Sequence, residues 1–298
     1  MAQTVKTPRF YVNVFEWLSS NGVLDINDVF RTNPSNFKSY NGSPYSISGE
    51  TFNDKAFIAI LGHTLSSDGY TASLQSDESN LSLTEIVNIG SDQNAIVPEY
   101  DGWSLATTDQ LNGKEQVAVY FTETLTQIGS IILGRYFDMP HSPDLSLTMT
   151  REFGGTKTLE TRGGNSLSNS FYNGSPNWGD KKAWQLGDLD ISVGGRRVWN
   201  LSFSYLSDSA VFQDNPSEIS AVDGIGYKLG DDTDDFTSSV LKYTQGGQFP
   251  FIFQPNGGSS GNNSHDQFAI CKFDMDSFQF KQVANSVYNI NLKIREVW

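Results

Sequence analysis

The sequence predicts an all-β protein with a β-sandwich or jelly-roll architecture. The 298-residue chain is rich in the aromatic residues that strands favour, with 20 Phe, 12 Tyr and 6 Trp. Its apolar segments are short, and many of them alternate with polar residues at the two-residue period of a strand. No helical segments separate these strands in a regular βαβ order, so a parallel sheet fold is not expected.

The first half of the chain contains a series of strand candidates separated by turn sequences. The alternation of Phe10, Val12 and Val14 favours a strand within the segment 8–22. Residues 56–61 are continuously apolar, as expected of a strand that is buried on both faces. Further strand candidates follow at 70–76, 102–106, 115–124 and 127–137.

The second half also consists of strand candidates, and one acidic segment interrupts them. Residues 145–153 alternate, and the clearest strand is expected to place four side chains on one face, namely Trp199, Leu201, Phe203 and Tyr205. The acidic run GDDTDDF predicts a loop or insertion at 206–240. Later strands align Phe249, Phe251 and Phe253, and the last strand aligns Tyr288, Ile290, Leu292 and Ile294.

The segment 138–144 predicts the junction between the two halves. Pro140 and Pro143 restrict the residues before them to extended conformations, which suits a corner or linker. We therefore expect one β domain at 1–138 and a second at 139–298. In the alternative arrangement a jelly roll is inserted into one larger sandwich, and residues 8–18 pair with the C-terminal strand.

Composition excludes several classes of function. A formal net charge of −14, with Arg196–Arg197 as the nearest basic cluster, argues against tight nucleic-acid binding. The single cysteine, Cys271, permits neither an intramolecular disulfide nor a cysteine zinc cluster. The first residues lack the apolar core of a signal peptide, and no apolar run is long enough to span a bilayer. We expect a soluble protein, made in a cytoplasm, with no membrane insertion.

The polar residues predict no catalytic or cofactor site. His63, His141 and His265 lie in separate turn-rich segments, and the HExxH, GxSxG and GxGxxG patterns are absent. We expect His63 to bond a backbone carbonyl in a turn. The acidic run 231–235 lacks the glycine and distal glutamate of an EF-hand, so a solvated loop is favoured over a calcium site. We therefore expect no enzyme, no cofactor and no metal.

Three tryptophans are the candidate contact residues. Trp103, Trp178 and Trp184 lie in polar surroundings rich in glycine and asparagine. Aromatic rings in the loops of a β-sandwich suit contacts with a saccharide or a partner protein. Structural anchoring of a long loop is the alternative interpretation of the same residues.

Two groups of motifs resemble virion proteins of tailed bacteriophages. AFIAILGHTLSSDG and the later QVAVYFTETLTQIGSIILGRYFDMP resemble a galactose-binding-like, discoidin-type jelly roll with an "ILGHN-L" turn and an "I-x-L-G" element, although Thr64 stands where Asn is common. GGRRVWNLSFSYLSD, FPFIFQP, DQFAICKF and YNINLKIREVW are similar to distal tail and tail-tip adaptor subunits. Together these stretches cover about half of the chain, and the segment 154–185 matches nothing in either group.

The resemblance implies a structural subunit of a phage tail, at the distal tail, baseplate or tail-tip adaptor position. Such a subunit would form a homo-oligomeric ring, dock other tail proteins and reside in the virion after assembly in the host cytoplasm. The implied domains are a galactose-binding-like jelly roll at 1–138 and a tail-protein-like β-sandwich at 139–298. The alternative function is a carbohydrate-binding module that recognises a host-surface glycan.

Overall fold

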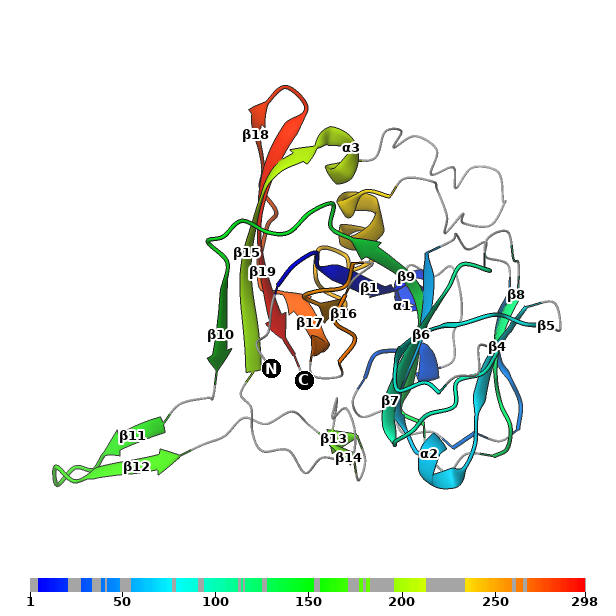
Figure 1. Ribbon diagram of the computed structural model, residues 1–298. Coiled ribbons are helices and arrows are strands. Elements are labelled where there is room, and N and C mark those ends of the chain that lie inside the picture. The colour runs from blue at the N-terminus through cyan, green and yellow to red at the C-terminus, as the bar shows by residue number, and fades with distance from the viewer. Residues whose placement is uncertain are drawn as a thin grey trace.

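The computed structural model is an all-β protein with a few short helices (Figure 1). It describes residues 5–20, 28–33, 39–40, 42–48, 55–76, 79–90, 94–111, 114, 116–124, 128–152, 156–170, 177–178, 181–182, 196–212, 234–258, 261–264 and 267–297. The predicted fold class is confirmed, because 47% of the residues lie in strands against 12% in helices, and the strands form large antiparallel sheets.

One large antiparallel sheet runs through both halves of the chain. Its strands, in spatial order, are β10 (Thr148–Glu152), β15 (Arg196–Ser207), β19 (Val287–Glu296), β17 (Ala269–Phe273), β16 (Phe251–Gln254), β1 (Arg9–Asn13), β9 (Ser130–Asp138), β3 (Ala56–His63), β7 (Gly102–Thr108) and β6 (Thr84–Val87). An eleventh strand, β18 (Phe280–Ala284), pairs with the first part of β19.

A smaller sheet covers one end of the large sheet, as Figure 1 shows beside β6 and β7. It consists of β2 (Tyr45–Ser48), β8 (Gln116–Phe121), β4 (Ala72–Ser76) and β5 (Ser79–Asn80). Its buried side chains include Leu74, Val117 and Val119, which join the same core as Ile58 and Ile60 of β3. The two sheets therefore form a sandwich with a common apolar interior.

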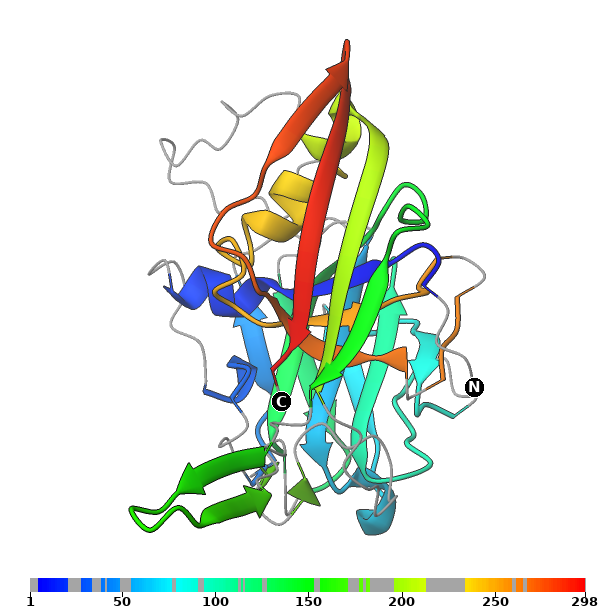
Figure 2. The same cartoon turned by 90° about the vertical axis from the view of Figure 1, so that its left-hand side faces the viewer.

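The remaining described elements are short. Two hairpins stand outside the sheets, β11 (Thr156–Glu160) with β12 (Ser166–Ser170) and β13 (Asn177–Trp178) with β14 (Lys181–Lys182). The helices are α1 (Val14–Ser20), α2 (Leu65–Asp68), α3 (Asp208–Val211), the 3-10 turn η1 (Asp28–Phe30) and the π-helical turn η3 (Thr237–Leu241). Figure 2 shows β15 and β19 as the longest ribbon of the molecule.

The strand predicted from the alternation of Phe10, Val12 and Val14 ends earlier than that pattern suggests. β1 stops at Asn13, and α1 begins at Val14. The Asn13 side chain caps this helix by accepting a hydrogen bond from the backbone N–H of Glu16 at 3.2 Å. Helical spacing then buries Phe15 and Leu18 in the core, so burial favours a helix over a longer strand.

The predicted pairing of residues 8–18 with the C-terminal strand is wrong. β1 is hydrogen-bonded to β9 on one side and to β16 on the other, with Arg9 opposite both Asp138 and Gln254. Since β16 follows the expected domain junction at 138–144, the sheet continues across it without a break. The division into 1–138 and 139–298 stays a prediction.

Tyr205 departs from the predicted alternation of its strand. Trp199, Leu201 and Phe203 are buried as expected, whereas Tyr205 is 81% exposed. The pairing of β15 with β19 shifts register between Phe203 and Leu206, and Tyr205 adopts a positive φ of 61° in this bulge. A bulge adds one residue to one strand, which turns the following side chain to the opposite face. On β19 the predicted inward set is confirmed for Ile290, Leu292 and Ile294.

The large sheet curls tightly around a second apolar cluster. Trp103 of β7 packs edge-to-face on Phe268, which directly precedes β17, with ring centroids 5.4 Å apart. Four strands lie between β7 and β17 in the sheet order, so a flat sheet would separate them by about 24 Å. The concave face encloses Tyr11, Phe57 and Ile132, and the opposite face packs against the smaller sheet and the helices.

Gly134 is required where β9 passes under the start of α1. A Cβ built at this position would lie 1.9 Å from the carbonyl oxygen of Val12 and 2.9 Å from the amide nitrogen of Val14. Both neighbours are backbone atoms of β1 and α1, which cannot move without breaking the pairing of β1 with β9. This glycine belongs to the sequence IILGR that carries part of the resemblance.

We predict that Gly134→Ala lowers the free energy of unfolding by at least about 3 kcal/mol, at the upper end of overpacking effects. Urea denaturation followed by tryptophan fluorescence measures this change. Gly163→Ala is the matched control, because an added Cβ there meets nothing within 4 Å. Equal denaturation midpoints for the two variants would contradict the requirement for glycine at position 134.

Candidate functional site

Of the three predicted contact residues, the structure describes the surroundings of one. Trp103 is only 4% exposed and its indole nitrogen has no hydrogen-bond partner. Trp178 lies in the short strand β13, whose side chains are outside the description, and Trp184 is outside the described residues. A saccharide could stack on Trp103 only if the ring were uncovered, which makes this residue a poor exposed platform for a sugar.

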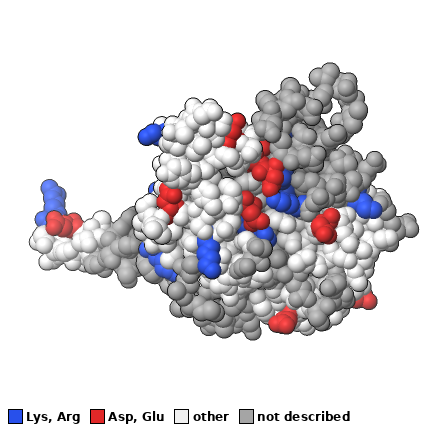
Figure 3. Space-filling model, turned by 45° about the horizontal axis from the view of Figure 1, so that its top comes forward, with Lys and Arg blue, Asp and Glu red and all other residues white. Residues whose placement is uncertain are grey.

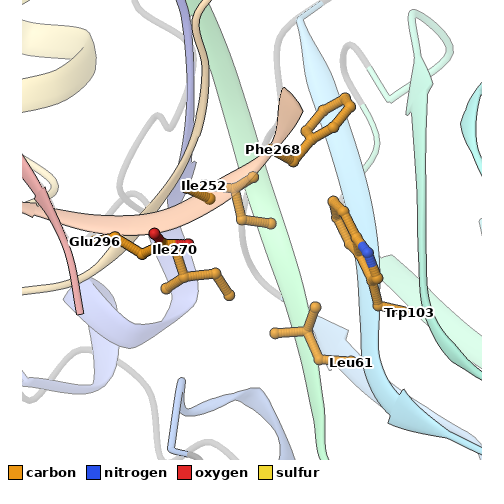
Figure 4. Close-up of a pocket in the computed structure, with 7 residues that line it drawn as sticks. Leu61, Trp103, Ile252, Phe268, Ile270 and Glu296 are labelled. Carbon is orange, nitrogen blue, oxygen red and sulfur yellow. The ribbon is translucent and has the colours of Figure 1, made fainter. Parts of the chain in front are cut away.

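Trp103 instead forms one wall of an open pocket at the mouth of the concave face (Figure 4). The pocket is shallow and its lining is mostly carbon. The lining residues are Leu61, Trp103, Ile252, Phe268, Ala269, Ile270 and Glu296. They come from β3, β7, β16, β17 and β19, so the curl of the large sheet creates the pocket. All of these residues except Glu296 are at most 5% exposed, so the pocket offers little open surface.

The one carboxylate of the pocket lining is held by an arginine. Arg197 donates to Glu296 from Nε at 3.0 Å, from a terminal nitrogen at 2.8 Å and from its backbone N–H at 2.9 Å. The same guanidinium donates to the carbonyl oxygen of Phe268 at 2.6 Å. Glu296 is therefore neutralised and fixed at the rim, and the pocket presents apolar surface beside a paired charge.

His63 lies in a buried polar network at the end of β3. It ends β3 and is fully buried, because Gly62 adopts a φ of 66° in a bulge opposite Gly102. Its Nε2 lies 3.0 Å from Ser104 Oγ, and its Nδ1 accepts the backbone N–H of Leu65 at 3.4 Å. The prediction of a bond to a backbone carbonyl is therefore wrong for this histidine.

The network continues from Ser104 to Asn88, and it keeps His63 neutral. The Ser104 hydroxyl donates to the carbonyl oxygen of Asn88 at 3.0 Å, which leaves its oxygen free to accept from His63 Nε2. Burial lowers the pKa of His63 to about 4, partly offset by the nearby carboxylate of Asp101. Ser104 and His63 are both fully buried, and their hydrogen bonds join β3, β7 and the loop after β6.

The other predicted polar features are structural in the part of the chain that is described. His141 bonds the carbonyl oxygen of Ser142 through Nδ1 at 2.8 Å, and His265 is outside the described residues. Within the acidic run, Asp234 pairs with Lys55, and Asp235 accepts the backbone N–H of Ser238 at 2.8 Å to start η3. Among the described residues no group of three or more His, Cys, Asp or Glu side chains could hold a metal ion.

Sequence reasoning missed both the pocket and the hairpin β11–β12. The pocket residues come from five strands, and their convergence depends on the curl, which no local pattern encodes. The hairpin carried only a weak signal, a turn with two glycines between segments that each contain one apolar residue. Its Leu159 and Leu167 are exposed by 66% and 59%.

Comparison with known proteins gives no match to a protein-family model, to a curated protein or to a solved structure. Among the described residues no helix is long and apolar enough to cross a membrane.

We predict that His63 makes the protein lose stability as the pH falls. The pKa of His63 is about 4 in the folded state and about 6.5 in the unfolded state. Between these two pH values the unfolded state therefore binds more protons than the folded state. The contribution of neutral His63 to the free energy of unfolding should be fully present above about pH 6.5. The free energy of unfolding should then fall by about 2 kcal/mol on acidification to about pH 5.

The free energy of unfolding in urea at several pH values measures this loss. His63→Gln should show a shallower pH dependence than the wild type, since it removes the titrating group. Gln282→Asn, which changes an exposed side chain that does not titrate, is the control and should keep the slope of the wild type. Equal slopes for wild type and His63→Gln would contradict the prediction.

Proposed function

We propose that this chain is a structural subunit of a bacteriophage tail, at the distal tail, baseplate or tail-tip adaptor position. It forms a homo-oligomeric ring and docks other tail proteins. The observation that carries the proposal is that the motifs which resemble tail proteins form the strands of the sandwich and its core, mostly in the large sheet and, for QVAVYF, in β8 of the smaller sheet. In a subunit whose role is structural, the residues that characterise it are expected to be those that hold its sheets together.

Residues of these motifs fix the shape and the packing of the large sheet. Gly62 of ILGH makes the bulge that buries His63, and Gly134 of IILGR lets β9 pass under α1. Trp199 of GGRRVWNLSFSYLSD is fully buried, and it packs edge-to-face on Phe253 with ring centroids 5.2 Å apart. Glu296 of YNINLKIREVW bonds Arg197 on β15, which ties the last strand to its neighbour.

An open sheet edge supports the assembly role. β10 pairs with β15 on one side and has no described strand on the other, and all five of its residues are exposed. An edge strand presents backbone donors and acceptors that a further strand can use. Arg295 pairs with Glu152 at the end of β10 at 2.7 Å, so this edge is held in place.

We predict that the purified chain forms a discrete oligomer of ring size, such as a trimer or a hexamer. Light scattering at several concentrations measures its mass, and negative-stain images should show rings or stacked rings. An antibody against the chain should decorate the tails of purified virions. A chain that stays strictly monomeric and is absent from virions would refute the proposal.

A further inference from the structure

The strand β15 carries an exposed tyrosine in a strained backbone conformation. Tyr205 has a positive φ of 61°, which a bulky residue adopts only at a cost in free energy, and it is 81% exposed. Glycine or asparagine would adopt this conformation more readily. Among the described residues, the other non-glycine residues with a positive φ are polar, namely Asn88, Gln245 and Ser286.

The bulge explains the backbone at this position but not the aromatic ring. Ser204 and Tyr205 together oppose Asn289 of β19, and the extra residue returns Leu206 to the core. The backbone N–H of Tyr205 donates to Asn289 Oδ1 at 3.2 Å, a bond that does not depend on the tyrosine side chain. Because the ring is exposed, its burial does not offset the strain. A strained residue of this kind indicates a role outside the fold.

The surface around Tyr205 consists of neutral hydroxyl and amide groups. Ser202 lies directly opposite Asn291, and its hydroxyl donates to Asn291 Oδ1 at 2.7 Å. Asn289 lies on the same face, because it is two residues away from Asn291 on one strand. Both amides are held through their oxygen atoms, and among the described residues neither Nδ2 group has a hydrogen-bond partner. Two oriented donors therefore lie beside the ring.

This face is open in the described part of the structure. The paired strands β15, β19 and β18, which we call the blade, rise beyond the body in Figure 1. Figure 2 looks at the outer side of the blade, and no described element covers its upper part, where β15 leads into α3. The inner side is occupied, because Phe212 packs there on Phe280 and Tyr288.

The charges near the ring are balanced. Asp144 accepts the hydroxyl of Ser204 at 2.7 Å and adds one carboxylate, and Lys281 of β18 lies opposite Asn289 and adds one ammonium group. Figure 3 shows acidic and basic residues interspersed, with no broad basic patch on the described part of the visible face. The net charge of −14 also repels anions at long range. These features favour a neutral ligand.

We propose that Tyr205, Asn289 and Asn291 form a binding site for a neutral saccharide. The C–H groups on one face of a sugar ring pack on the tyrosine ring, and the two Nδ2 groups donate to the sugar hydroxyls. The centre of a protein interface is usually apolar, whereas hydroxyl and amide groups surround Tyr205. The site goes beyond the proposed function, because a subunit can carry it in any state of assembly.

The first test is binding of the purified chain to immobilised oligosaccharides. The array carries linear oligomers of glucose, galactose, mannose and N-acetylglucosamine, with uronic-acid oligomers as the acidic comparison. The wild type should be retained on a neutral oligomer and not on the acidic ones. Retention on none of the neutral oligomers overturns the inference.

Substitutions at Tyr205 then test the ring, with titration calorimetry on the retained oligosaccharide. Tyr205→Phe keeps the ring and should bind within about threefold of the wild type. Tyr205→Asn removes the ring, so its dissociation constant should rise at least about 10-fold. Its urea midpoint should equal or exceed that of the wild type, because asparagine tolerates the positive φ. Leu167→Ser is the matched control: it removes an exposed apolar side chain elsewhere and should bind like the wild type.

Asn291→Ala tests the polar part of the site and leaves the bulge intact. It removes one donor and should raise the dissociation constant by about fivefold. If Tyr205→Asn fails to fold, unchanged affinity of Asn291→Ala overturns the inference. A folded Tyr205→Asn variant with the affinity of the wild type also overturns it.

One further outcome would assign the ring to a protein contact instead. If Tyr205→Asn loses the oligomer and the wild type retains no oligosaccharide, the exposed ring serves association between copies, and the saccharide site is refuted. The mass of the wild-type chain tests the proposed function separately. A monomer that binds the oligosaccharide through Tyr205 would support the site and count against the ring.

Discussion

The structure depends on β1, the strand hydrogen-bonded on both sides in the middle of the large sheet. Phe10 faces the main core and lies within about 6 Å of four phenylalanine rings, those of Phe236, Phe251, Phe253 and Phe273. Tyr11 faces the concave cluster, where burial raises its pKa, and its hydroxyl donates to Gln254 at 2.8 Å. A single five-residue strand thus joins two apolar cores and strands from both halves of the sequence.

The charged residues beside β1 hold this arrangement in register. Arg9 bonds Asp138 in a bidentate pair at 2.6 and 2.8 Å, between residues that face each other on β1 and β9. Its guanidinium also lies over the Tyr136 ring, 4.2 Å from the centroid. A one-residue slip of β1 would exchange Phe10 and Tyr11 between the two cores, and it would leave Arg9 without its carboxylate. The curl that forms the pocket follows from this fixed register.

Local patterns predicted the strands well and the candidate site poorly. The inward sets of the last strand and of Trp199, Leu201 and Phe203 follow from period-two alternation, because each strand buries one face. The alternation failed at Tyr205 because a bulge turns this side chain outward. It failed at Val14 because the Asn13 side chain caps a helix, α1, that replaces the end of the predicted strand. The pocket depends on five strands that a curl brings together, and the burial of Trp103 follows from the same curl. Neither is encoded in a short window of sequence.

The acidity of the chain constrains how copies can meet. Two copies, each with a net charge of −14, repel at long range, and salt screens this repulsion over about 10 Å. Association of two copies therefore has to gain its free energy from short-range contacts. The burial of apolar surface is one source, and pairing of backbone groups along β10, which has no described strand on its outer side, is another.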